Sequence, residues 1–102
     1  MSKPLVSVVE LSGYLRRAAK LLSETERDAV VDFLAANPTA GVELGSGVRK
    51  FRWGSRGAYR IIHFFADDQT PVFLIDIYAK NAKANLSEAD VDAIRIAVKA
   101  IR

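Results

Sequence analysis

The sequence contains no cysteine and a single histidine, His63. Without cysteine the chain can form neither disulfides nor thiolate metal sites. One histidine among scattered carboxylates does not make a cluster of metal ligands. We therefore expect a protein with no metal site and no cofactor, in which any catalysis comes from ordinary side chains or from the substrate itself.

Long hydrophobic runs are also lacking. No stretch approaches the ~20 apolar residues that cross a membrane, and the first residues do not have the basic and apolar regions of a secretion signal. The sequence thus predicts a cytoplasmic protein without a membrane partner. Its 102 residues, 50% of them hydrophobic, suit one folded domain covering residues 1–102.

Acidic residues are absent from one long stretch of the chain. The protein as a whole has 15 Lys and Arg against 12 Asp and Glu, a net charge of +3, so the excess is modest. Between Glu43 and Asp67, however, every charged residue is basic. These residues are Arg49, Lys50, Arg52, Arg56 and Arg60. Aromatic residues stand beside two of the arginines, a pattern typical of contacts with phosphates and bases. The alternative is a basic outer surface that only keeps the protein soluble.

Three strands are predicted in and after this basic stretch. The runs 48–53, 58–65 and 72–80 are rich in β-branched and aromatic residues, and glycine, aspartate or proline separates them. A fourth strand is expected at 5–11, and 39–47 is expected to be a linker rich in small residues.

Helices are predicted on both sides of these strands in the chain. An amphipathic helix is expected at 12–22, and a second one follows the capping box that begins at Ser23 and stops before Pro38. Ser87 opens a third helix with a similar cap. The expected order is β-α-α-β-β-β-α. This is an α+β fold in which an N-terminal helical hairpin and a C-terminal helix pack on a small twisted antiparallel sheet of about four strands.

Strand alternation predicts which side chains share a face. Lys50 and Arg52 point to one side of their strand, and Phe51 and Trp53 point to the other. If Tyr59 and the alternate residues of the neighbouring strand face the helices, Arg60 lies on the same side of the sheet as Lys50 and Arg52. One face of the sheet is then cationic.

In the last strand Phe73, Ile75 and Ile77 are expected to form one apolar face, with Tyr78 and Lys80 on the opposite side. Asp76 is also expected on that opposite side. His63 lies on the same side of its own strand as Tyr59 and Ile61, the side that is expected to face the core. We therefore interpret it as a packed, hydrogen-bonded histidine and not as a catalytic base.

Several short segments together carry a resemblance to a known family. The chain resembles the RelE/ParE superfamily of bacterial toxins, and within it the HigB-type branch most. The resemblance covers nearly the whole chain, although the turn 54–57 is shorter than the family's loop and His63 stands where the family has an aromatic residue. The matching segments are 33–38, 48–53, 57–62, 72–74 and 77–83.

The resemblance implies a toxin of a type II toxin-antitoxin system. Such a toxin enters the 30S A site of the ribosome and cleaves mRNA there, using the RNA 2′-hydroxyl as the nucleophile and no metal. Cleavage inhibits translation and arrests growth, and a cognate antitoxin protein is the inhibitory partner.

The matching motifs assign residues to this work. Arg60 is expected to bind the scissile phosphate, because a guanidinium can bond to two phosphate oxygens at once. Lys50 is the candidate general base or acid, and Arg52 and Lys80 complete the catalytic set. The residues expected to contact RNA around them are Arg49, Arg56, Tyr78 and Lys83.

Two other functions fit the same residues. The ParE-like branch of the superfamily inhibits DNA gyrase, although such members lack the basic catalytic set. A non-catalytic nucleic-acid-binding module would use the same charges only to hold phosphates.

Overall fold

The computed structural model describes residues 5–82 and 86–101, so the predicted RNA contact Lys83 lies outside the described residues. The order of elements is β-α-α-β-β-β-β-α, which confirms the predicted α+β class and adds one strand. A short 3₁₀ turn, η1, joins two of the strands. The elements are β1 (Val8–Glu10), α1 (Ser12–Leu21), α2 (Glu24–Ala36), β2 (Val42–Gly45), β3 (Val48–Trp53), η1 (Ser55–Gly57), β4 (Tyr59–Phe64), β5 (Val72–Ala79) and α3 (Glu88–Ile101).

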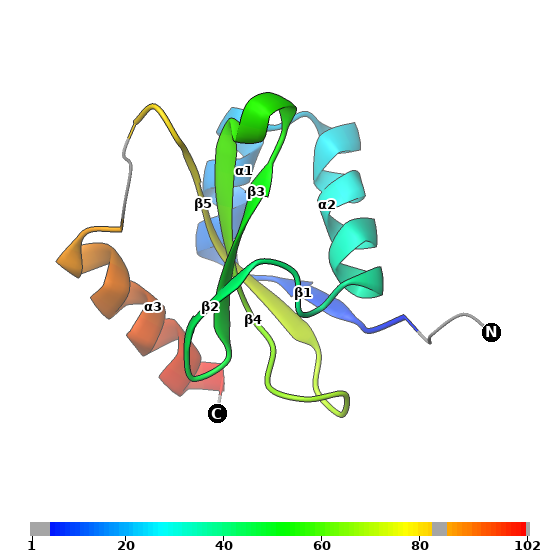
Figure 1. The fold of residues 1–102 in the computed structure, drawn as a ribbon, viewed down its shortest axis with the longest axis vertical. Helices are drawn as coiled ribbons and strands as arrows, with labels where there is room; N and C mark the ends of the chain where they lie inside the picture. Colours follow the sequence, from blue (N-terminus) through cyan, green and yellow to red (C-terminus); the bar gives the residue numbers. More distant parts are fainter. Residues whose placement is uncertain (1–4, 83–85, 102) are drawn as a thin grey trace.

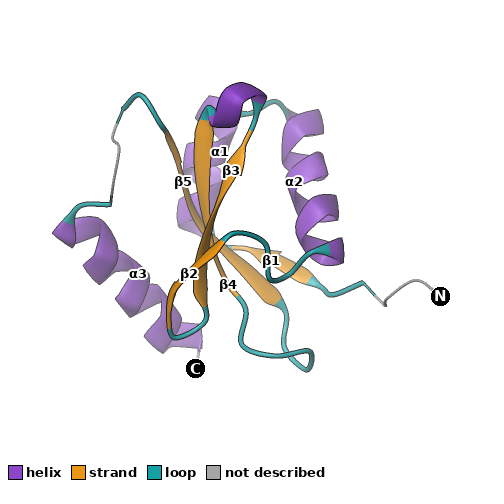
Figure 2. Ribbon diagram, viewed as in Figure 1, coloured by secondary structure: helices purple, strands orange, loops and turns teal. Residues whose placement is uncertain are grey.

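The sheet lies between two layers of helix (Figures 1 and 2). Its strands are ordered β1-β5-β4-β3-β2. The hairpin of α1 and α2 covers one face, where Tyr14 and Leu34 pack on Phe51, Ile61 and Ile77. On the other face, α3 covers part of the sheet through a second apolar cluster: Val48, Ile62, Phe64, Ile75, Ile94 and Val98. No helix in the described part of the chain is long and apolar enough to cross a membrane.

The helix caps predicted at Ser23 and Ser87 are confirmed. The Ser23 hydroxyl accepts a hydrogen bond from the Glu26 amide at 3.1 Å, and the Glu26 carboxylate accepts one from the Ser23 amide at 3.0 Å. Ser87 and Asp90 make the same reciprocal pair before α3, at 3.1 and 3.0 Å. Each pair satisfies amides that a helix leaves without an internal partner.

The predicted linker 39–47 is only partly a linker, because it contains β2. This strand pairs antiparallel with β3 through a tight turn at Ser46 and Gly47, whose φ angles are 54° and 86°. Positive φ at both central residues is the geometry that a two-residue hairpin needs. All four residues of β2 are exposed, and a strand without a buried face has no apolar alternation to reveal it.

The first strand is shorter than predicted and runs in a different direction. Only Val8–Glu10 is a strand, and it pairs parallel with β5, so the sheet is mixed and not wholly antiparallel. The direction of β1 relative to β5 depends on the path of the chain through the helical hairpin. The pattern of residues within a strand does not indicate it.

The predicted apolar face of Phe73, Ile75 and Ile77 is wrong, because β5 contains a bulge. Ile62 pairs with Asp76 while His63 pairs with Leu74, which leaves Ile75 as an extra residue. As a result Leu74 and Ile77 both pack under α1 and α2, whereas Phe73 and Ile75 pack against α3. An extra residue in one strand shifts the side-chain alternation on either side of it.

Candidate nucleic-acid interface

Basic side chains from three strands share one face of the sheet. Arg52 on β3 lies directly opposite Arg60 on β4, and Arg60 lies opposite Tyr78 on β5. Residues that are directly opposite in adjacent strands point to the same side. Lys50 stands two residues from Arg52 on β3, so alternation brings it to this side as well. Lys80 directly follows the end of β5, and its amide still bonds to the Ala58 carbonyl just before β4, so we group it with these residues. We call Lys50, Arg52, Arg60 and Lys80 the cationic face.

Backbone carbonyls of the turn between β3 and β4 accept hydrogen bonds from two residues of the cationic face. The Arg60 Nη1 donates to the Gly57 carbonyl, and the Lys80 amide donates to the Ala58 carbonyl at 2.8 Å. A Cβ at Gly57 would lie 3.2 Å from Arg52 Cδ and 3.3 Å from Arg60 Nη1. Both arginine side chains therefore lie close to Gly57, in space that a larger residue would partly fill.

No carboxylate neutralises the cationic face within residues 5–82 and 86–101. The ion pairs there involve Arg17, Arg49 and Arg95, and none includes a member of the face. Like charges directly across a sheet are destabilising. Opposing Arg52 to Arg60 therefore costs the fold free energy, and an anionic ligand would recover it.

The residues predicted to contact RNA around this face have different environments. Arg49 points to the other side of β3, where its guanidinium contacts Glu43 at 3.6 Å and the Thr39 carbonyl at 3.1 Å. Arg56 is exposed in the turn. Tyr78 shares the face but is only 5% exposed, within the cluster under α3. The structure thus places Tyr78 on the cationic face, leaves Arg56 exposed in the turn between β3 and β4, and directs Arg49 to the other side.

His63 is buried, as expected from its parity. It has no exposed surface, its ring packs edge-on against Phe51, and its Nε2 lies 3.0 Å from the Ala40 carbonyl. Because a carbonyl only accepts, Nε2 carries the proton. Burial lowers the pKa of His63 below its ordinary 6.5, the bond to Ala40 opposes that change, and the charge of Arg49 lowers the pKa further. The histidine supports the core under α2 and does not reach the cationic face.

This environment makes stability depend on pH. Below about pH 6.5 the unfolded chain binds a proton at His63 that the folded chain excludes, so the free energy of unfolding should fall as the pH drops from 7.5 to 5.5. Above pH 7 this contribution should be flat. Urea unfolding at several pH values should show a steeper acid loss for the wild type than for His63→Gln, which keeps a donor for Ala40 but does not titrate. Parallel pH curves for the two proteins would contradict the assignment.

Two aromatic residues near the charges belong to the core. Tyr59 donates its hydroxyl proton to the Leu21 carbonyl at 3.2 Å. Trp53 packs against Phe33 and Phe51, with ring centroids 5.6 and 6.2 Å away. Both residues pack on the face under α1 and α2 and so do not form a stacking surface on the cationic face.

Two residues that sequence reasoning gave no functional role are important for the geometry. Gly57 holds Arg60 and gives space to Arg52, as described above. Asp76 is only 9% exposed and forms an ion pair with Arg17 at 3.1 Å, which ties β5 to α1. It lies opposite Ile62, on the same side of the sheet as Tyr78, and its carboxylate pairs with Arg17 instead of with the cationic face. For Gly57, the only signal in the sequence was the glycine-rich composition of its turn. No local pattern indicated the role of Asp76.

No three histidine or carboxylate side chains gather as metal ligands in the part of the chain that the structure describes. The charged residues that the fold does bring together are cations, which suit an anionic ligand.

The fold is similar to that of a known toxin. No protein-family model matches the chain. Among solved structures, a mutant of the Escherichia coli toxin RelE in the free state superimposes with a TM-score of 0.61. The match covers 96% of this chain and 99% of that one, at 19% sequence identity. At this identity the similarity shows the fold, and the chain therefore has a RelE-like α+β fold.

Proposed function

We propose that this protein is the toxin of a type II toxin-antitoxin system and a ribosome-dependent mRNA endoribonuclease of the HigB-type branch. One observation carries the proposal: Lys50, Arg52 and Arg60 share one face of β3 and β4, Lys80 directly follows β5, and no ion pair of the described residues includes any of the four. The RelE-like fold supports the same assignment.

The reaction needs little from the protein. The RNA 2′-hydroxyl attacks the adjacent phosphorus, the bond from phosphorus to the 5′-oxygen breaks, and the products carry a 2′,3′-cyclic phosphate and a 5′-hydroxyl. One proton leaves the 2′-oxygen and one reaches the departing 5′-oxygen. Negative charge accumulates on the phosphorane between these events, so fixed positive groups lower the barrier.

The cationic face can supply these groups. We assign Arg60 to the scissile phosphate, because its side chain is held by the Gly57 carbonyl and is half-buried in the middle strand of the face. Arg52 stands directly opposite and shares the developing charge. Lys50 is the group that we assign to proton transfer, and Lys80 holds the substrate from the end of β5.

The partners follow from this activity. The mRNA in the ribosomal A site is the substrate, the action is cytoplasmic, and a cognate antitoxin restrains the toxin. We propose that Arg56 and Lys83 contact the RNA backbone beside the reacting phosphate.

Primer extension tests the proposal. Purified protein is stripped of metal with EDTA and dialysed, and is then added to ribosomes programmed with a defined mRNA in magnesium buffer. Cuts within the A-site codon are expected. The same protein is then added to a DNA gyrase supercoiling assay. Inhibition of gyrase without mRNA cuts would reject the proposal in favour of a ParE-like toxin. RNA binding without any cut would reject it in favour of a non-catalytic binding module.

RNA binding should depend steeply on salt. Five cations, the cationic face together with Arg56, would contact about five phosphates, which predicts a slope of roughly −3 to −4 for log affinity against log salt on single-stranded RNA. Lys80→Ala should reduce the slope by about 0.7. Fluorescence anisotropy between 50 and 300 mM salt measures both values. A slope near zero would show that the face does not bind phosphates.

A further inference from the structure

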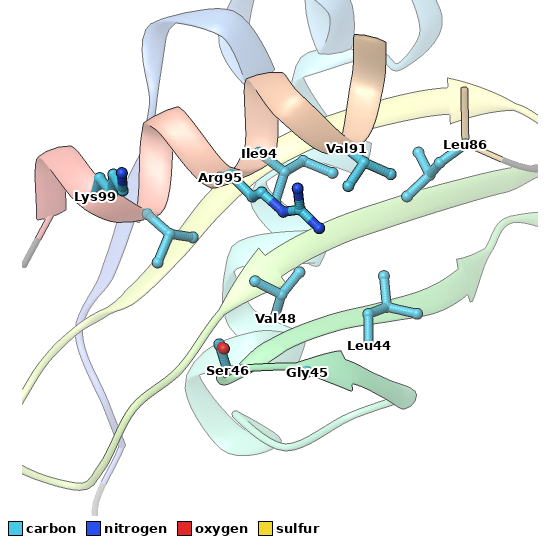
Figure 3. Close-up of a pocket in the computed structure, with 10 residues that line it drawn as sticks. Leu44, Gly45, Ser46, Val48, Leu86, Val91, Ile94, Arg95 and Lys99 are labelled. Carbon is cyan, nitrogen blue, oxygen red and sulfur yellow. The ribbon is translucent and has the colours of Figure 1, made fainter. Parts of the chain in front are cut away.

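Lys50 lies near the outer edge of the sheet. It pairs with Ile62 of β4 on one side and with Val42 of β2 on the other. β2 is the last strand of the sheet, and all four of its residues are exposed. An open groove of about 530 Å³, lined by Leu44, separates the hairpin of β2 and β3 from α3 (Figure 3). The helix α3 therefore gives little support to the strand beside Lys50.

Support comes from the opposite face of the sheet, through residues 39–41, which we call the strap. The His63 Nε2 donates to the Ala40 carbonyl at 3.0 Å, and the Arg49 Nη1 donates to the Thr39 carbonyl at 3.1 Å. Arg49 and His63 lie directly opposite each other on β3 and β4, so both point to the side away from the cationic face. The two hydrogen bonds thus hold the strap across the back of β3 and β4.

Gly41 brings the strap into contact with the backbone of Lys50. A Cβ at Gly41 would overlap the Lys50 carbonyl oxygen and would lie 2.8 Å from Phe51 Cβ. The φ angle of Gly41 is +87°, in the left-handed region that favours glycine. The Phe51 ring in turn packs edge-on against the His63 ring, with centroids 5.3 Å apart. The backbone around Lys50 therefore contacts the strap and the histidine that holds it.

Strand alternation transmits these contacts to the cationic face. Arg49 and Phe51 flank Lys50 in the chain, and both point to the strap side of β3. Holding these two neighbours fixes the backbone of Lys50 and the direction in which its side chain leaves the strand. The Lys50 side chain points to the other face, so the strap acts on it through the backbone and does not touch a ligand bound there.

We propose that the strap fixes the position of Lys50 on the cationic face, which makes Gly41 and His63 positioning residues for proton transfer. The inference rests on the proposed function for the role of Lys50, whereas the contacts of the strap do not depend on it. A group that transfers a proton must lie within hydrogen-bond reach of the reacting oxygen. A displacement of about 1 Å can cost about 100-fold in rate.

Two pairs of variants test the proposal. His63→Leu removes the donor to Ala40, and His63→Gln keeps one. Gly41→Ala puts a methyl group against Lys50, whereas a Cβ in Gly45→Ala, also at a positive φ angle, would meet nothing within 4 Å. His63→Leu and Gly41→Ala should each lower the single-turnover cleavage rate about tenfold or more, with RNA affinity unchanged within about threefold. His63→Gln should restore most of the rate, and Gly45→Ala should keep the wild-type rate.

NMR of the lysine side chains separates this inference from the nuclease proposal. In protein labelled with ¹³C- and ¹⁵N-lysine, the Cε and Nζ signals of Lys50 should move in His63→Leu and in Gly41→Ala. The signals of Lys80, at the end of β5, should stay in place. Lys50→Arg assigns the Lys50 signals by their disappearance. If the wild type cuts no mRNA, the proposed function fails, and these signals alone decide whether the strap fixes Lys50.

The contrary outcomes are equally specific. Lys50 signals that stay in place in both strap variants would overturn the proposal, and so would equal rate losses in His63→Leu and His63→Gln. A loss of RNA affinity as large as the loss of rate would also overturn it, because the strap would then support binding and not proton transfer. Thermal melting shows which variants are folded at the assay temperature. If Gly41→Ala is unfolded, the two His63 variants decide the result.

Discussion

Arg60→Ala should abolish mRNA cleavage and growth arrest while leaving the fold intact. Removal of one preorganised group that stabilises transition-state charge costs about 100- to 1000-fold in rate. Among the described residues, the Arg60 side chain donates to the Gly57 and Tyr59 carbonyls alone, and it stands opposite the like charge of Arg52. Its loss should therefore change the free energy of unfolding by less than about 1 kcal/mol.

The measurement is single-turnover primer extension together with viable counts after induction. Arg60→Lys should recover little activity, because an ammonium cannot reproduce two parallel bonds to phosphate oxygens. Arg16→Ala, an exposed arginine on α1, is the matched control and should remain fully toxic. If Arg60→Ala were as toxic as the wild type, the catalytic assignment would be wrong.

Gly57→Ala should lower cleavage about 10- to 100-fold with a modest loss of stability. The new methyl group would meet Arg52 Cδ at 3.2 Å and Arg60 Nη1 at 3.3 Å, so both side chains must move. Displacements of about 1 Å at a reacting centre can cost 100-fold in rate. The φ angle of Gly57 is +64°, within the left-handed region, where a non-glycine residue costs about 1 to 2 kcal/mol.

Gly45→Ala separates strain from displacement. Gly45 has a φ angle of +116°, and a Cβ there would meet nothing within 4 Å. The substitution should therefore destabilise the chain by roughly 1 to 3 kcal/mol and leave the cleavage rate of the folded protein unchanged. Measuring both variants at a temperature where each is folded distinguishes the two effects. Equal activity losses would show that Gly57 acts only through backbone strain.

Local chemistry was enough to predict most of the elements. The reciprocal caps at Ser23 and Ser87 act within four residues, so their sequence signature and their structure coincide. The buried strands β3, β4 and β5 were predicted because their side chains are apolar and β-branched. β2 was missed because it buries no side chain, and its pairing depends on the turn at Ser46 and Gly47.

For the candidate site, too, some features were predicted from the sequence and others required the tertiary structure. Strand alternation alone placed Lys50 and Arg52 on one side of their strand, and His63 with the core. Arg49 was predicted to contact RNA, but its guanidinium contacts Glu43 on the other side of β3. Bringing Arg60 opposite Arg52 required the register of β3 with β4, and the roles of Gly57 and Asp76 required the positions of side chains distant in sequence.

The sequence by itself determined the class of fold, the positive charge of one stretch and the absence of cysteine chemistry, because composition and short-range periodicity carry this information. The tertiary structure alone decided the bulge in β5, the parallel pairing of β1 and the close approach of Arg52 and Arg60 at Gly57. Each of these depends on which strand lies next to which and in what register. That choice is made by the packing of the whole core and leaves no local trace in the chain.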